Sequence, residues 1–478
     1  MLFNSIDFVI FLPIVFLLYW FVTQKSLKAQ NVLLMVASYF FYACWDWRFL
    51  FLLAFSTVLD FYSGLKVDQS TNINRRKMWL TISVLINLGF LAFFKYYNFF
   101  VSSFAEMIEL LGFKANIPTL KIILPVGISF YTFHGLSYVF DIYNRKIKPT
   151  TNFIQYSLFV SFFPLLVAGP IERATHLLPQ IEKPRTFNYF KAVDGLRQIL
   201  WGFFKKIVIA DQCAELANEI FNQSADQSAS TLLLGAFYFT FQIYGDFSGY
   251  SDIALGTARL FGFELLRNFA YPYFSRDIAE FWRRWHISLS SWFKDYLYIP
   301  LGGSSGGNWM RIRNTFIIFI VSGFWHGANW TFIVWGALNA LFIMPSIIFK
   351  TNRNNIEIVA KGKLLPTFQD FYKILITFVL TMLAWIFFRA ESVNHAISYI
   401  VGIFDLSIAT IPAFFSAKLI VLITFFMLIE WLGREFQFGL QNFAFKWNRI
   451  FRWGFYVGLL FIIFISSGKE QAFIYFQF

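Results

Sequence analysis

Apolar stretches long enough to cross a lipid bilayer recur along the whole sequence, and they constrain the fold more than any other feature. A helix rises 1.5 Å per residue, so roughly 20 apolar residues span the hydrocarbon core. Helices suit this environment because their backbone hydrogen bonds are all internal. The sequence therefore predicts an all-α polytopic membrane protein with about 11–13 transmembrane or re-entrant helices. The apolar windows, about twelve in number, are 7–22, 31–45, 49–65, 79–100, 122–142, 153–167, 231–244, 315–326, 331–349, 372–388, 418–432 and 453–466.

Composition agrees with membrane insertion and argues against nucleic acid as a partner. Only 14% of the residues are charged, whereas soluble domains carry roughly 25%. The net charge of +13 comes from basic residues that cluster between the apolar windows, as cytoplasmic loops do. The two cysteines, Cys44 and Cys213, have neither metal-ligand spacing nor the pattern of a disulfide framework. Membrane lipid is thus the expected surrounding, and no metal site is predicted.

The distribution of Lys and Arg among the first loops predicts the orientation. Met1–Ser5 carries none, and the second loop has only Arg48, offset by Asp46. Cytoplasmic loops are enriched in these residues. We therefore expect an N-terminus outside the cytoplasmic membrane and loops one, three and five inside it. The basic residues of those three loops are Lys25, Lys28, Lys66, Arg75, Arg76, Lys77, Arg145, Lys146 and Lys148.

Three Gly/Pro-containing breaks interrupt apolar windows, at Leu124–Gly127, Ala168–Pro170 and Gly245–Gly249. Irregular backbone at membrane depth is tolerated only where protein or water satisfies it. The breaks therefore predict re-entrant segments beside an internal cavity. No internal repeat is apparent, which disfavours a transporter built from inverted repeats. We expect one membrane domain over residues 1–478.

The strongest candidate site is His326, which lies inside an apolar run. Ionisable side chains at membrane depth are costly and persist where they pair, line a cavity or do chemistry, and imidazole transfers protons near neutral pH. Ser322, Trp325 and Asn329 are sequence neighbours of His326. These three and Trp285 are candidate lining residues, and on a helix Ser322 and Asn329 would share the face of His326. The competing interpretation is that His326 is a hydrogen-bonded packing residue between helices.

A second candidate lies in segment 279–300, which is too polar to span and too aromatic for an ordinary loop. It contains His286 after Arg283, Arg284 and Trp285, and on a continuous helix His286 would lie one turn from Trp282. The alternative is an interfacial amphipathic helix with snorkelling arginines. The glycine-rich run that follows, 301–307, lacks the ending of a phosphate loop and is interpreted as a turn.

One further carboxylate, Asp246, lies in the break at 245–249. Two interpretations stay open for it: a helix cap followed by a turn, or a lining residue at the entrance for a polar substrate.

Several of these phrases together resemble the membrane-bound O-acyltransferase family, in its bacterial branch that O-acetylates exported polysaccharides such as alginate. The resemblance runs from end to end of the chain. The matching phrases are Met1–Ser5, Gly169–Arg173, Asp246–Ala254, Trp282–Leu289, Tyr298–Gly303 and Trp325–Trp330.

The resemblance implies a helical fold around a central tunnel and an O-acetyltransferase of the bacterial inner membrane. The family's near-invariant histidine matches His326, and its second active-site position matches His286. It implies no bound cofactor, acetyl-CoA as the donor, a polysaccharide acceptor, and a periplasmic or membrane-anchored acetyltransferase as partner.

The residues suit that chemistry. A histidine can act as general base for a hydroxyl that attacks a thioester, and no Gly-x-Ser-x-Gly elbow lies near His326. We therefore expect direct transfer rather than a Ser or Cys acyl-enzyme, with Arg283 and Arg284 binding the phosphates of the donor. Two alternatives remain: D-alanyl transfer to lipoteichoic acid by the same fold, and a polysaccharide or ion transporter.

Overall fold

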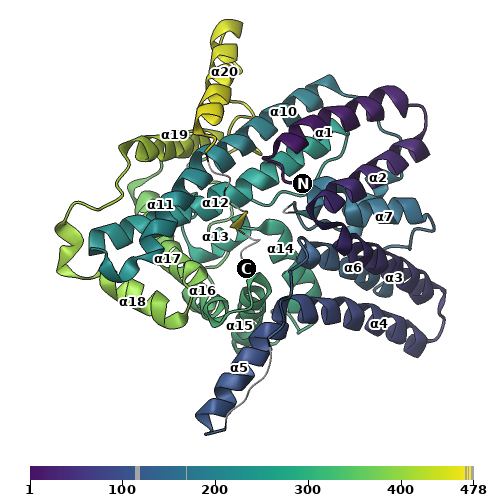
Figure 1. The fold of residues 1–478 in the computed structure, drawn as a ribbon, viewed down its shortest axis with the longest axis horizontal. Coiled ribbons are helices and arrows are strands. Elements are labelled where there is room, and N and C mark those ends of the chain that lie inside the picture. The colour runs from purple at the N-terminus through teal and green to yellow at the C-terminus, as the bar shows by residue number, and fades with distance from the viewer. Residues whose placement is uncertain (114–118, 168, 469–470, 472, 475–478) are drawn as a thin grey trace. The chain divides into compact units, whose positions relative to one another are not determined.

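The computed structural model describes residues 1–113, 119–167, 169–468, 471 and 473–474, and all regular elements among them are helices. The all-α class predicted from the sequence is thus confirmed. The chain forms two compact units (Figure 1): Met1–Ala192 with Ala258–Leu266, and Val193–Thr257 with Arg267–Phe478.

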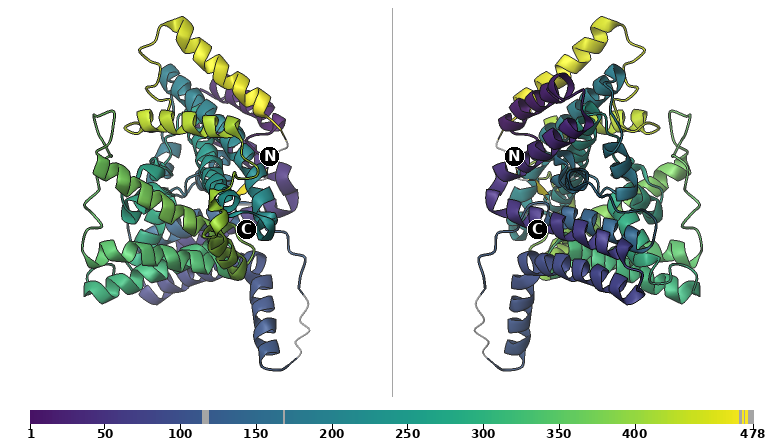
Figure 2. Two further views of the ribbon diagram at one scale, coloured as in Figure 1. Left: turned by 90° about the vertical axis from the view of Figure 1, so that its left-hand side faces the viewer. Right: turned by 90° about the vertical axis from the view of Figure 1, so that its right-hand side faces the viewer.

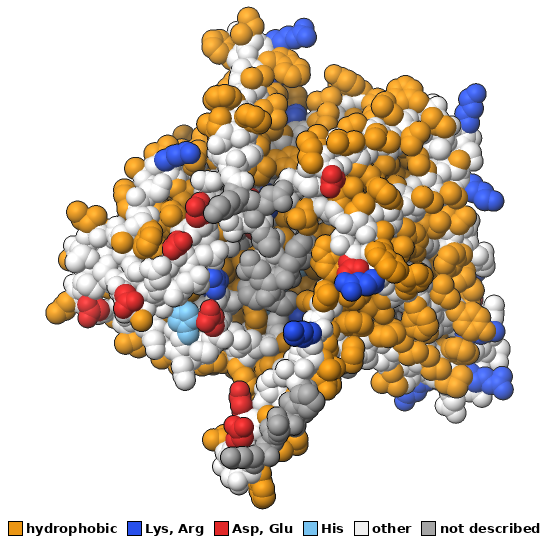
Figure 3. Space-filling model, in the orientation of Figure 1, with side chains coloured by type: hydrophobic (Ala, Val, Ile, Leu, Met, Phe, Trp, Pro, Cys, Tyr) orange, Lys and Arg blue, Asp and Glu red, His pale blue; other side chains and the backbone are white. Residues whose placement is uncertain are grey.

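Long apolar helices confirm a multi-pass membrane protein. Among the described residues, five helical stretches are long and apolar enough to cross a bilayer, and Ile6–Val22 and Val393–Ile403 are shorter apolar helices. Large hydrophobic side chains such as Phe21, 77% exposed, face outward, and Figure 3 shows hydrophobic side chains over much of the visible face. A surface of this kind suits lipid as solvent. The five stretches are Leu27–Gln69, Ile73–Leu110, Trp330–Ile348, Phe368–Arg389 and Arg449–Ser466.

The N-terminal unit contains the first nine α-helices. Helices α3, α4 and α6 pack against one another (Figure 1), and the buried Asp60 of α3 accepts hydrogen bonds from Ser83 Oγ at 2.7 Å and Asn87 Nδ2 at 2.8 Å. Helix α5 projects away from this group in both views of Figure 2. The elements are α1 (Ile6–Leu17) continued by η1 (Leu18–Val22), α2 (Leu27–Asp46), α3 (Leu50–Gln69), α4 (Ile73–Leu91), α5 (Tyr97–Leu110), α6 (Ile128–Tyr143), α7 (Phe153–Ser161), α8 (Phe163–Leu166) and α9 (Ala174–Ile181).

The second unit contains the candidate site. Helices α15 and α16 form its most extensive pair, and α16 also packs on α17. The elements are most of α10 (Tyr189–Phe203) continued by η4 (Phe204–Ala210), α11 (Asp211–Asn222), most of α12 (Ala229–Leu260), α13 (Ile278–Arg284), α14 (Ile287–Phe293) continued by η7 (Lys294–Tyr298), α15 (Gly307–His326), α16 (Trp330–Ile348), α17 (Phe368–Arg389), α18 (Val393–Ile403), α19 (Ala417–Gly433) and α20 (Arg449–Ser466).

Two of the three expected breaks interrupt the helices, and one does not. Gly127 has φ +76° and begins α6, while Gly169 and Pro170 lie in a non-helical stretch between α8 and α9; Ala168 is outside the described residues. The break expected at 245–249 is wrong, because α12 runs unbroken over 32 residues. A Cβ on Gly249 would meet Gly202 O at 2.8 Å, so this glycine permits close helix packing instead.

Candidate active site

His326 is positioned by the end of one helix and the start of the next. Helix α15 ends at His326 because Gly327 is extended, and Asn329 caps α16 by accepting a hydrogen bond from Thr331 N. The helices approach closely, since a Cβ on Gly323 would lie 3.4 Å from Gly336 Cα. His326 is therefore held, 3% exposed, at the base of a tight helical hairpin.

His286 lies at a sharp turn between two short helices. Helix α13 ends at Arg284, and His286 has φ 43° and ψ 54° before α14 begins. The continuous helix expected through Trp282 and His286 is therefore wrong. Left-handed backbone is uncommon for residues other than Gly, although Asn, Asp and His adopt it more often than the rest, and such conformations gather at functional sites. The turn directs the ring of His286 toward that of His326.

The two imidazoles lie within reach of one substrate group. Their ring centroids are 6.5 Å apart. Trp325 lies 6.1 Å from His286 and 5.0 Å from His326, and Trp335 and Phe388 meet His326 edge to face at 5.2 and 5.3 Å. These aromatic side chains pack against the two imidazole rings.

Both histidines line one cavity of about 670 Å³. A volume of this size is typical of sites for small organic ligands. Apolar side chains including Phe293 and Ile318 line its walls, and no Asp or Glu is among the lining residues, all of which are described. Five cations also line it: Arg283, Lys294, Arg311, Lys350 and Arg353. Buried histidines and exposed cations thus share one apolar-walled space.

His286 is electrically neutral and open at both ring nitrogens. Burial lowers its pKa from 6.5 to about 3, because desolvation disfavours the imidazolium. Neither Nδ1 nor Nε2 has a hydrogen-bond partner among the described residues. An unpaired buried polar atom costs free energy, so the ring is ready to bind a substrate hydroxyl or carbonyl.

Some of the predicted site residues line the cavity, and others pack behind it. Ser322 and Arg283 line the cavity with the two histidines. Trp285 and Trp325 do not line it; they pack behind it, and Trp285 contacts Trp385 with ring centroids 4.9 Å apart.

Three other predicted residues lie outside the cavity lining for clear physical reasons. Asn329 follows the end of α15, so it does not continue the helical face of His326; its Nδ2 donates to Glu391 O at 3.0 Å. Asp246 lies inside α12 rather than at a cap, with Oδ1 2.7 Å from Lys206 Nζ. Arg284 turns away from the cavity and bonds Glu280 at 2.6 Å.

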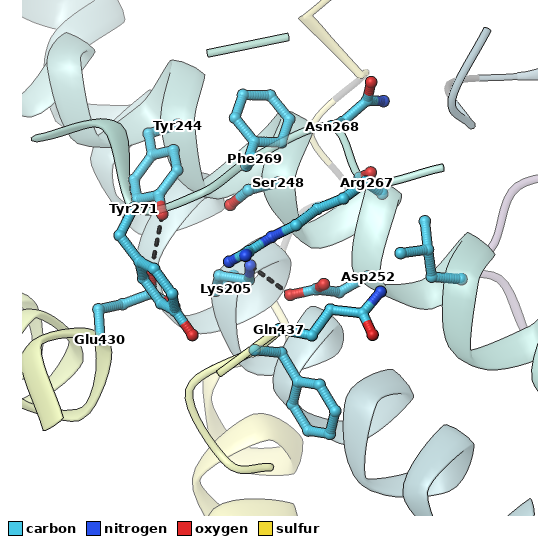
Figure 4. Close-up of a pocket in the computed structure, with 13 residues that line it drawn as sticks. Lys205, Tyr244, Ser248, Asp252, Arg267, Asn268, Phe269, Tyr271, Glu430 and Gln437 are labelled. Atoms are coloured by element: carbon cyan, nitrogen blue, oxygen red, sulfur yellow. Dashed lines mark hydrogen bonds and ion pairs between the residues drawn. The ribbon is translucent and has the colours of Figure 1, made fainter. Parts of the chain in front are cut away.

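Asn268 lines a small polar pocket (Figure 4) and supports the backbone that follows His286. Asn268 O accepts a hydrogen bond from Ile287 N at 2.9 Å, and Asn268 Oδ1 accepts one from Ser288 Oγ at 2.6 Å. Figure 4 shows Lys205 paired with Asp252, at 2.5 Å, and Tyr244 bonded to Glu430, at 2.6 Å. Asn268 therefore holds the first turn of α14 from within a buried ionic network.

Arg311, Lys350 and Arg353 line the cavity but belong to no motif in the sequence. Arg311 lies in the first turns of α15, and Lys350 and Arg353 follow the end of α16. Their only sequence signal is their place directly beside an apolar window, which basic loop residues share. No group of three or more His, Cys, Asp or Glu is placed to hold a metal ion in the part of the chain that the structure describes.

The sequence of this chain is similar to those of several known proteins. The sequence profile of the membrane-bound O-acyltransferase family matches residues 143–388. A probable alginate O-acetylase of Pseudomonas aeruginosa is 40% identical over 83% of this chain and 73% of its own length. A peptidoglycan O-acetyltransferase of Helicobacter pylori is 36% identical over 85% and 80%. A teichoic acid D-alanyltransferase of Bacillus subtilis is 26% identical over 58% and 72%. Both histidines lie inside the matched region.

Proposed function

The chain belongs to the membrane-bound O-acyltransferase family, and we propose that it moves an acetyl group from cytoplasmic acetyl-CoA across the membrane for O-acetylation of an exported, alginate-like polysaccharide. O-acyltransferase activity follows from the family. The acetyl group and the polysaccharide are supported by the names of relatives 36–40% identical. D-alanyl transfer has weaker support, since the relatives of that activity are 26–30% identical.

The observation that carries the proposal is the pairing of His326 and His286 at one cavity. The acceptor oxygen attacks the thioester carbonyl, His326 takes the hydroxyl proton, and the carbon–sulfur bond breaks as the thiolate leaves. The thiolate then regains a proton. Neutral His286 offers a donor or an acceptor to the same carbonyl or hydroxyl, and neither cysteine lines the cavity.

The cations of the cavity suit a donor that carries phosphates. Arg283, Lys294 and Lys350 are exposed side chains, and cations in a cavity whose lining includes no carboxylate attract phosphate. We place the phosphates of coenzyme A among them, with the narrow pantetheine arm reaching the histidines. We also propose that a periplasmic or membrane-anchored acetyltransferase passes the group to the polysaccharide.

Replacing Arg283 with glutamine should raise the donor KM several-fold and leave kcat nearly unchanged, because its charge acts on binding. Arg284 provides the matched control. Arg284→Gln removes a partner of the buried Glu280, which is 1% exposed, so it should lower thermal stability and leave the donor KM unchanged. Steady-state kinetics of the purified enzyme with a soluble acceptor separate the two. An unaltered donor KM in Arg283→Gln would contradict phosphate binding by this residue.

The proposed orientation is tested by thiol labelling in sealed cells. Cys44 is exposed and lies beside Asp46, so an impermeant maleimide should label it from outside. In a background with Cys44 and Cys213 replaced by serine, a cysteine at Ser5 should also react, and one at Asn72 should react only after lysis. Labelling of the Asn72 position in intact cells would reverse the assignment.

A further inference from the structure

We propose that a second cavity, in the N-terminal unit, binds a phosphate-type anion through four cations that surround it, as carried by the headgroup of an anionic phospholipid or by soluble phosphate. The cavity has a volume of about 330 Å³. It lies within Met1–Ala192 and Ala258–Leu266 and shares no lining residue with the cavity of the two histidines. Its cations are Lys183, Arg185, Lys191 and Arg259.

The cavity carries more positive charge than its surroundings neutralise. Its lining residues, all described, include no carboxylate. Glu264 lies nearby and pairs with Lys191 and Arg259, each at 3.1 Å. Within the described parts of the chain, Lys183 and Arg185 form no ion pair. Lys183 and Arg185 therefore contribute positive charge that no ion pair offsets, which leaves a site that attracts an anion.

Arg185 is the cation that most needs a counter-charge. It is only 9% exposed, and its guanidinium donates to neutral acceptors: Asn31 Oδ1 at 2.6 Å, and the carbonyls of Gln180 and Ile181 at 3.3 Å. Its Nε has no partner in the described structure. A buried guanidinium without a carboxylate is costly, and an anion in the adjoining cavity would offset that cost.

The backbone around the cavity also favours an anion. Asn188 lines it and caps α10, because its Oδ1 accepts from Lys191 N at 3.0 Å, and a helix N-terminus carries partial positive charge. Gly262, with φ +85°, also lines the cavity, and a Cβ there would lie 3.6 Å from the stem of Arg185.

The aromatic part of the lining suits the level of lipid headgroups. Trp20 belongs to the last turn of the first apolar helix; its Nε1 donates to Leu260 O at 2.8 Å, and its ring packs on Phe187 at 5.5 Å. Indole rings at the ends of apolar helices are typical of the membrane interface. The cavity thus combines a buried indole at the end of an apolar helix with unbalanced cations.

The test measures thermal stability of the purified full chain in neutral detergent. Short-chain phosphatidylglycerol should raise Tm in a saturable way, and phosphatidylcholine of equal chain length should not. The double variant Lys183→Gln/Lys191→Gln should need at least about tenfold more phosphatidylglycerol for the same shift. The matched control, Lys25→Gln/Lys28→Gln, changes two exposed lysines of the same unit outside the cavity and should respond like wild type.

Inorganic phosphate distinguishes the two sources of the anion. A Tm shift with phosphate alone, also weakened in the double variant, identifies a soluble anion, whereas a shift with phosphatidylglycerol only identifies lipid. Either result supports the proposal. The absence of a shift with both anions, or an equal response of the cavity variant and wild type, overturns it.

Discussion

Replacing His326 with alanine should reduce acetylation of the acceptor polysaccharide to background while the protein still accumulates in the membrane. The substitution removes the group that takes the hydroxyl proton, and general-base catalysis contributes roughly 10²–10⁴-fold to rate. The fold should survive because the hairpin of α15 and α16 is held by contacts such as Gly323 against Gly336, which the substitution leaves in place.

The measurement is the acetyl ester content of the purified polysaccharide, with the amount of enzyme in the membrane determined in parallel. His326→Gln keeps polar volume between Trp335 and Phe388 and should be equally inactive. His395→Ala is the matched control, because this histidine bonds Ser224 and lies outside the cavity lining. Acetylation by His326→Ala at the wild-type level would exclude His326 as the base.

The second large effect is expected at His286, where backbone and side chain can be separated. His286→Ala should lose most activity and also stability, because alanine in the left-handed region at φ 43° costs about 1 kcal/mol. Asparagine adopts this region readily, so His286→Asn should match the Tm of wild type and still lose most transfer. Measuring Tm and initial rates of both variants separates the two effects. Full transfer by His286→Asn would show that the imidazole is not required.

The lowered pKa of His286 predicts a pH dependence with a definite sign. In the unfolded chain this ring binds a proton below pH 6.5, whereas in the folded protein it does so only near 3. The unfolded state therefore binds more protons between these values, and the free energy of unfolding falls as pH drops through that window. Between pH 7 and pH 5, Tm of wild type should fall more than Tm of His286→Asn. Equal falls would contradict burial of a neutral His286.

The class of the protein and the two candidate histidines are predictable from the sequence alone. The core of a bilayer offers the backbone no water as a hydrogen-bond partner. Repeated apolar windows of this length therefore favour helices, whose backbone hydrogen bonds are internal. Histidine within or beside such windows is costly and therefore rare, so the sequence predicts His326 and His286 as candidate site residues.

Which neighbours share the cavity with the histidines depends on how the helices pack. Asn329 and Asp246 were placed by assuming where helices end, yet α15 ends at His326 and α12 passes through Asp246. Such ends depend on packing that a local sequence pattern does not contain. The direction of a charged side chain is equally non-local: Arg283 lines the cavity, while the adjacent Arg284 is turned inward by Glu280. Arg311, Lys350 and Arg353 join the site because folding brings separate helix ends together.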